Sequence, residues 1–362
     1  MNRVVITGVG VLSPAGVGVE AFQRALREGR PLGEAVDRPG RHRRPDALKV
    51  AKIPQFDREQ YLSARKLRRM GELSQIWTLA CLLARSDAGL EQEASTPPEK
   101  RGTFLGTGLG CTDTTWEYLE GMLKDGMGSA SPYLFAESVA NAPAGHSAIE
   151  IDARGTCVTL TCGDASATAA LGTAARALRE GRLEMAYCGG VELMTAPLLR
   201  ALGPLGGPSH LGEGAVCLIL ETLQRAKSRN ARILAEVTGI GLASDPQAPA
   251  TSWSCDPRVF SLAMRRALAG AGNEDEKSRS PVGSLLLHAS GWEASDSAER
   301  AAGESVCPGV RQWTVTQVFG SHAAAGGLAL AAAALETREH GSILLSAHAW
   351  GGGAYSLLLR AH

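Results

Sequence analysis

The stretch Thr161-Cys162-Gly163-Asp164-Ala165-Ser166 decides the fold of this chain. It follows the short run Val158–Leu160, whose apolar and β-branched residues are typical of a strand. An alanine-rich segment from about Ala165 to Leu178 comes next and predicts a helix with a small face. A further apolar run ends in the pair Gly189-Gly190. The pattern predicts a strand, a tight turn and a helix, with Asp164 at the helix start.

The same strand–turn–helix pattern recurs later in the chain. Sliding the sequence by 157 positions places Gly163 on Gly320, Leu171 on Leu328 and Asp164 on Ser321. It also places Val158-Thr159 on Val315-Thr316. Each copy is followed by an apolar run with glycines. A duplicated unit of this kind predicts two similar α/β halves that pack together.

The two halves are expected at residues 1–225 and 226–362. The stretch Leu223–Arg232 is rich in charge and lies between two apolar, strand-like runs, which favours a boundary there. The loop at 272–281 combines Asn, Asp, Glu, Lys, Ser and Pro and predicts a solvated connector within the second half.

Composition argues against several kinds of partner. The chain has 362 residues, 44% of them hydrophobic, with 37 basic and 37 acidic residues. A balanced charge gives no basic excess for nucleic acid or a membrane surface. Neither an apolar run of membrane-spanning length nor a leader pattern is present, so we expect a cytoplasmic protein. The eight cysteines lack C-x-x-C spacing, so no metal is expected, and most lie in apolar runs typical of buried thiols.

Several segments together resemble the β-ketoacyl synthase family. They are the opening Arg3–Gly16, the basic-then-apolar segment Leu67–Leu90, and Leu211–Glu221 with its charged continuation. In that family a catalytic cysteine lies 25 residues before a Gly-Gly pair, and counting back 25 from Gly189 gives Asp164. The resemblance implies a thiolase-like fold, in which two similar halves form a five-layer αβαβα sandwich.

The resemblance also implies that no intact catalytic set remains. Asp164 takes the place of the cysteine, and a carboxylate cannot hold an acyl group as a thioester. Ser321 takes the place of the second histidine, although an alignment that uses His322 stays open. Thr316 takes the place of a lysine. His288 keeps the first histidine, followed by Asp296 and Glu299 as in the family's His…Asp-x-x-Glu pattern.

Other readings of these residues stay open. Asp164 is interpreted first as a cap for helix amides rather than as a cryptic acid or base. His288 is either a remnant of the site or a structural residue. Cys162 is a rival nucleophile, but we expect it to point to the other side of the turn. Trp350 takes the place of the family's gating aromatic residue.

Members of the family that lack the cysteine are chain length factors, the ketosynthase β-subunits of type II polyketide synthases. The resemblance implies a heterodimer with a catalytic ketosynthase. It implies no cofactor of its own, because acyl groups arrive on the phosphopantetheine of a carrier protein that docks mainly on the partner. The alternative is a synthase-like transferase or malonyl-carrier decarboxylase with residual activity.

The resemblance further implies that the acyl tunnel ends at the dimer interface, against a helix expected at Thr112–Leu123. Thr112, Trp116 and Leu119 have helical spacing and share one face. Trp116 is the expected floor, with Phe135 beside it, and the alternative is that Trp116 packs in the core. The region around the strand before Asp164, together with the preceding segment Ser131–Ile149, is the expected interface.

Overall fold

The computed structural model describes residues 1–36, 48–91, 96–205, 210–270, 282–321 and 323–362, except for the side chains of 202–205 and 323–326. The connector expected at 272–281 and the alternative position His322 lie outside the described residues. Among the described residues, no helix combines the length and the apolar character that crossing a bilayer needs.

The N-terminal half is built on five strands in the order β6-β5-β7-β9-β1. β5 pairs in parallel with β6 and β7, whereas β9 is antiparallel to both β7 and β1. β6 is therefore the edge strand of this half. The strands are β1 (Val4–Ser13), β5 (Arg101–Gly106), β6 (Cys157–Leu160), β7 (Met185–Glu192) and β9 (Gly214–Thr222).

The C-terminal half repeats this arrangement in the order β12-β11-β13-β14-β10. Its first strand, β10, pairs with β1 through Ile6 and Ala235. The five strands of each half, together with the short β2 (Gly16–Val17), therefore join into one 11-stranded sheet. α9 (Leu223–Ser228) links the halves, and the expected division at residue 225 falls within it. The strands are β10 (Ala235–Ser244), β11 (Ser284–Leu286), β12 (Gln312–Trp313), β13 (Ser342–His348) and β14 (Gly353–Arg360).

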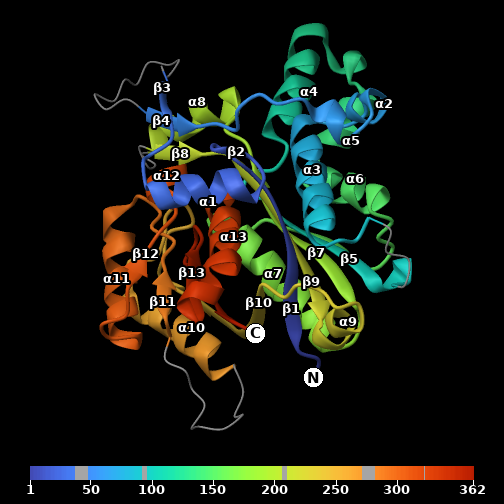
Figure 1. Cartoon of the computed structure of the whole chain (residues 1–362). Helices are drawn as coiled ribbons and strands as arrows, with labels where there is room; N and C mark the ends of the chain where they lie inside the picture. The colour runs from blue at the N-terminus through green and yellow to red at the C-terminus, as the bar shows by residue number, and fades with distance from the viewer. Residues whose placement is uncertain (37–47, 92–95, 206–209, 271–281, 322) are drawn as a thin grey trace.

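Helices cover both faces of each half and fill the space between them. α3 and α6 pack on the outer face of the N-terminal half, and α10 and α11 on that of the C-terminal half. α7 and α13 pack on each other and on strands of both halves (Figure 1). The predicted thiolase-like sandwich of five layers is confirmed. These helices are α3 (Glu72–Asp87), α6 (Ala142–Glu150), α7 (Ser166–Arg179), α10 (Pro257–Ala269), α11 (Glu293–Val306) and α13 (Ala323–His340).

The alanine-rich sequence explains the central layer, because small side chains let helices approach the strands closely. A Cβ added to Gly106 on β5 would lie 2.3 Å from the carbonyl carbon of Ser166, so β5 and the start of α7 are in backbone contact. The 157-residue repeat holds for α7 with α13 and for β7 with β13, whose first residues differ by 157. It does not hold for the strands before these helices, because a short helix, α12 (Thr316–Phe319), occupies the position that the repeat assigns to a strand.

The remaining elements lie around this sandwich. Figure 1 shows α4 and α5 above α3 and α6, and α8 beside a small three-stranded sheet of β3, β4 and β8. The expected helix at Thr112–Leu123 is confirmed as α4 and extends to Asp125. These elements are α1 (Val19–Glu28), α2 (Ala64–Leu67), β3 (Glu34–Val36), β4 (Leu48–Ala51), α4 (Thr112–Asp125), α5 (Pro132–Ser138), α8 (Ala196–Leu205) and β8 (His210–Gly212).

Candidate functional site

Asp164 lies in a 3₁₀ turn, Gly163–Ala165, between β6 and α7. Ser166 fixes this turn, because its hydroxyl accepts from the Cys162 amide at 2.8 Å and donates to the Gly163 carbonyl at 2.6 Å. The N-cap of α7 is Ala165, which makes no side-chain capping bond. The expected cap role of Asp164 is therefore corrected. Its carboxylate, only 4% exposed, lies instead in ion-pair contact with a histidine from the other half.

That histidine is His288, which lies just after β11 and is 3% exposed. Its Nε2 is 3.6 Å from Asp164 Oδ2. The loop that carries it is held by Glu299, whose two oxygens each accept a backbone N–H, from His288 and from Ala289, at 3.0 Å. Asp296 accepts from the Ser290 hydroxyl and the Gly291 amide. The two acids that follow His288 in the sequence thus shape its loop.

A second buried histidine, His348 at the end of β13, was not found from the sequence. Its Nε2 lies 3.3 Å from Glu299 Oε2, and its ring centroid is 4.4 Å from that of His288. Burial acts to raise the pKa of Glu299, but His348 and then His288 outweigh it and hold this pKa at about 2. Burial acts to lower the pKa of His288, but Asp164 and the nearby acids raise it overall. A single signal was available in the sequence, a histidine within an apolar strand.

Glu192, at the end of β7, is the second residue that sequence reasoning missed. One oxygen, Oε2, accepts from the amides of Gly108 and Leu109 at 2.8 and 3.0 Å. Burial, with a smaller contribution from the charge of Asp164, raises the pKa of Glu192 to about 8 despite these bonds. At neutral pH this carboxyl is therefore mostly protonated. Its place two residues after the Gly-Gly pair, in an otherwise apolar strand, was the available signal.

Ser321 and Thr316, where the resemblance implies a replaced histidine and a replaced lysine, make hydrogen bonds away from Asp164. The Ser321 hydroxyl donates to the carbonyl of His210 on β8 at 3.0 Å. The Thr316 hydroxyl pairs with that of Thr314 at 2.9 Å. In the described part of the chain, neither side chain makes a hydrogen bond to Asp164 or His288. The site therefore holds one carboxylate and one imidazole at the positions expected from the sequence, with no thiol between them.

Trp350 lies in the glycine turn after β13, next to the Asp164 turn. A Cβ built on Gly163 would be 3.6 Å from the Trp350 amide nitrogen. Trp350 packs edge-to-face on Trp253 at 5.5 Å between ring centroids, and Trp253 packs on Trp292 at 6.3 Å. We call Trp253, Trp292 and Trp350 the tryptophan cluster. It places bulky aromatic rings beside a site that is already closed to solvent.

Cys162 points away from His288, as expected. Its thiol borders a cavity of about 530 Å³ between α7, β10 and β14, which Tyr355 also lines. Burial, and then a hydrogen bond with Cys162, raise the pKa of Tyr355 to about 12. No disulfide involves any of the eight cysteines, and three of them, Cys157, Cys162 and Cys255, are not buried. The part of the chain that the structure describes holds no cluster of metal-ligating side chains.

The expected tunnel residues lie on and beside α4. Thr112 faces inward, where its hydroxyl pairs with that of Thr195 at 3.0 Å. Trp116 and Leu119 are 45% and 46% exposed, and the Arg200 guanidinium of α8 lies 6.0 Å from the Trp116 ring centroid. The alternative that Trp116 packs in the core of this chain is therefore wrong. Phe135 on α5 is exposed and packs on Tyr118, with ring centroids 5.9 Å apart, so its expected place beside Trp116 is corrected. We call the exposed large apolar residues of this region the α4–α5 apolar face: Trp116, Leu119, Leu123, Met127, Tyr133, Phe135 and Val139.

Comparison with known proteins agrees with this geometry. Residues 1–203, more than half of the chain, match the model described as beta-ketoacyl synthase, N-terminal domain. The chain belongs to the β-ketoacyl synthase family. A 3-oxoacyl-(acyl-carrier-protein) synthase 2 from Coxiella burnetii is 27% identical over 89% of this chain and 78% of its own length. A putative polyketide beta-ketoacyl synthase 1 from Streptomyces virginiae is 29% identical over 83% of this chain and 76% of its own.

Solved structures show the same fold along the whole chain. A chain from the ishigamide ketosynthase/chain length factor structure superposes with a TM-score of 0.88 at 25% identity, covering 100% of this chain and 99% of its own. The curated relatives are mostly synthases, whereas this structural neighbour comes from a ketosynthase/chain length factor pair. Family membership by itself therefore does not separate a catalytic subunit from its partner, and the site must do so.

Proposed function

We propose that this chain is a non-catalytic chain length factor, which pairs with a catalytic ketosynthase in a type II polyketide synthase and shapes the acyl tunnel. The observation that carries the proposal is the carboxylate of Asp164 at the position of the family's cysteine. Thioester exchange needs a thiolate, because the acyl group must first form a bond to sulfur. A carbon nucleophile then breaks this bond during condensation. A carboxylate buried against an imidazole offers no such atom.

The remaining residues of the site support a structural role. Condensation also needs donors that stabilise the thioester oxygen as charge develops. His288 keeps an imidazole there, but its Nε2 faces Asp164 at 3.6 Å, and its loop is held by Glu299. Ser321 and Thr316 bond elsewhere. The pair therefore serves to join the two halves of the fold rather than to bind substrate.

The surface of the chain supports a partner. The α4–α5 apolar face holds seven exposed large apolar side chains, with Ile149 on α6 exposed as well. Monomeric proteins rarely expose so many large apolar groups in one region. β6 is an edge strand with an exposed Cys157, so its backbone is available to pair with another strand. Both features lie in or beside the expected interface, Ser131–Ile149 and the strand before Asp164.

In this role, the growing acyl chain stays attached to the partner or to the phosphopantetheine of its carrier protein. The chain supplies walls to the tunnel rather than a cofactor. Trp116 and Leu119 form the outer floor, and Thr112 lies behind them against α8. The tryptophan cluster, with Trp350 as its gate residue, keeps a carrier arm out of this subunit. The carrier protein accordingly docks mainly on the partner.

Co-expression with a ketosynthase that has an intact Cys and two His tests the proposal. We expect a stable 1:1 complex by native mass spectrometry, with product formed from malonyl-carrier protein by the complex and none by the isolated chain. Cys→Ser in the partner should abolish the product, whereas Asp164→Ala in this chain should leave it. A soluble monomer that ignores the ketosynthase, or an acyl adduct on the isolated chain, would exclude this role.

The contact between His288 and Asp164 favours one second candidate, a residual malonyl-carrier decarboxylase, in which the imidazole stabilises the enolate. Carbon dioxide release from malonyl-carrier protein by the isolated chain measures it directly. His288→Ala should abolish any release that depends on this site. Release that persists in His288→Ala does not come from this site.

A further inference from the structure

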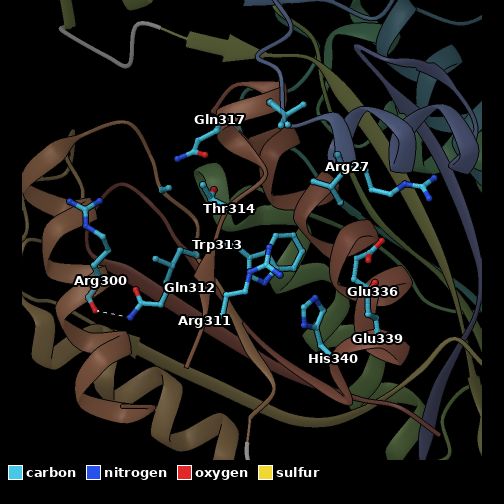
Figure 2. A pocket seen from close by; sticks show the side chains of 15 residues that line it. Arg27, Arg300, Arg311, Gln312, Trp313, Thr314, Gln317, Glu336, Glu339 and His340 are labelled. Carbon is cyan, nitrogen blue, oxygen red and sulfur yellow. Dashed lines mark hydrogen bonds between the residues drawn. The ribbon is translucent and has the colours of Figure 1, made fainter. Parts of the chain in front are cut away.

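A cleft of about 610 Å³ opens beside β12, at the opposite end of the sheet order from β6. Its walls come from β12, α12, the last turns of α13 and the end of α1 (Figure 2). Clefts of this size are typical of sites for small molecules. Of the residues that shape the Asp164 site, Ala289 alone lines it, and no residue of the α4–α5 apolar face does.

One wall joins a cation to an aromatic platform. Arg311 and Trp313 are two residues apart in an extended segment, so their side chains share one face. Gln312 turns the other way and donates to the carbonyl of Arg300 at 3.4 Å. The indole N–H of Trp313 donates to Ser284 at 3.1 Å, and its ring stacks on His340 at 6.0 Å between centroids. The platform is thus held in place before any ligand arrives.

The facing wall carries two acids, Glu336 and Glu339, with Arg27 from the end of α1 beside them. Glu336, Glu339 and His340 follow helical spacing and lie on one face of α13. Glu336 accepts from Gln23 at 3.1 Å, whereas Glu339 is exposed. Figure 2 shows these acids on one side of Trp313, with Arg300 and Gln312 on its other side. In the described part of the molecule, the side chains of Glu339 and Arg311 make no hydrogen bond or ion pair of their own.

We propose that this cleft binds a small zwitterion of the amino-acid class, with a planar or apolar body. The carboxylate pairs with the Arg311 guanidinium, the ammonium pairs with Glu339, and the body lies on Trp313. The arrangement disfavours an anion, which meets Glu339, and a cation, which meets Arg311. Charge-assisted bonds give orientation, and the aromatic face gives contact area. The inference is independent of the pairing with a ketosynthase.

Titration calorimetry of the full chain with L-tryptophan as the probe tests this site. We expect saturable 1:1 binding. Tryptamine, which lacks the carboxylate, and 3-(indol-3-yl)propanoate, which lacks the ammonium, should each bind at least about tenfold more weakly, because each loses one charge-assisted bond. Glycine, which lacks the body, should also bind more weakly.

Variants then assign the contacts. Arg311→Gln should weaken L-tryptophan about tenfold or more and should not weaken tryptamine, which loses an unfavourable charge. Glu339→Gln should weaken tryptamine and should not weaken 3-(indol-3-yl)propanoate, for the same reason. Trp313→Leu should weaken all three. Arg24→Gln, an exposed arginine on α1 away from the cleft, is the control, and circular dichroism verifies folding. Absence of binding at millimolar probe, or equal affinity for tryptophan and both analogues, overturns the proposal.

Discussion

Asp164 and His288 come from opposite halves of the fold, and Oδ2 of the first lies 3.6 Å from Nε2 of the second. Both side chains are almost fully buried. The position at which the sequence resemblance places the family's cysteine is thus occupied by one member of a buried Asp–His pair. This pair bridges the start of α7 and the end of β11, so in the proposed role it joins the two halves instead of carrying an acyl group.

Asp164→Asn tests the bridge by its pH dependence. The folded-state pKa of His288 lies above its ordinary value of 6.5. The pair's contribution to the free energy of unfolding is therefore complete below about pH 6.5 and is lost as pH rises through the folded pKa. We expect Asp164→Asn to lower the free energy of unfolding by about 3 kcal/mol or more near pH 6.5, and by less once the pH exceeds the folded-state pKa of His288. Urea unfolding across a pH series measures this difference. The exposed Asp152→Asn serves as control, and a pH-independent cost for Asp164→Asn would contradict the bridge.

Glu192→Gln should change a second pH dependence. The folded-state pKa of Glu192 is about 8, against an ordinary value of 4.5. The folded chain binds more protons than the unfolded chain between these values, so the free energy of unfolding falls as pH rises, by at most about 1.4 kcal/mol per pH unit. Glutamine keeps an acceptor for the Gly108 and Leu109 amides. The free energy of unfolding of Glu192→Gln should rise relative to that of the wild type from pH 5 to 8. The exposed control Glu20→Gln should show the same pH dependence as the wild type throughout.

Trp116→Ala should lengthen the product of the complex. Its indole is exposed in this chain, and its removal leaves space at the proposed tunnel floor for additional carbons. Mass spectrometry of released chains measures the shift, with native mass spectrometry to verify assembly. Leu262→Ala, which truncates an exposed leucine on α10 outside the α4–α5 apolar face, is the matched control. An unchanged length distribution from an assembled Trp116→Ala complex places the floor elsewhere.

Asp164→Cys should not restore condensation. The variant regains a sulfur, but Ser321 and Thr316 still lack the imidazole and ammonium groups of an active synthase. We expect no product from acyl- and malonyl-carrier protein with the isolated variant. Product from this single substitution would show that the remaining residues suffice, and the non-catalytic interpretation would fail.

Two glycines should respond to alanine in opposite ways. A Cβ at Gly106 would lie 2.3 Å from the Ser166 backbone, so Gly106→Ala must push α7 away from β5 and should cost several kcal/mol. A Cβ at Gly121 on α4 meets nothing within 4 Å, and Gly121→Ala should gain up to about 1 kcal/mol through helix propensity. Thermal unfolding of the isolated chain compares them. Similar effects in the two variants would mean that the β5–α7 contact adjusts freely.

The sequence predicted the fold from features that act locally. Alanine richness, glycine turns and apolar runs predicted α7, α13 and the strands after them, and α4 began at the expected residue. The prediction was wrong where a local pattern was extended by analogy. The repeat assigned Val315-Thr316 to a strand, but these residues start α12, because the chain turns early after the two-residue strand β12.

The sequence by itself determined that residue 164 is an aspartate, and the resemblance places it where the family has its cysteine, which requires no coordinates. It also determined two similar halves, because periodicity records which faces are buried. Only the tertiary structure decided what Asp164 does. His288, Glu299 and His348 are far from it in the chain, and the ion pair forms because the central helices bring the ends of β6 and β11 together. The exposure of Trp116 and the cleft at Trp313 likewise depend on which elements pack against each other, and no local pattern encodes that.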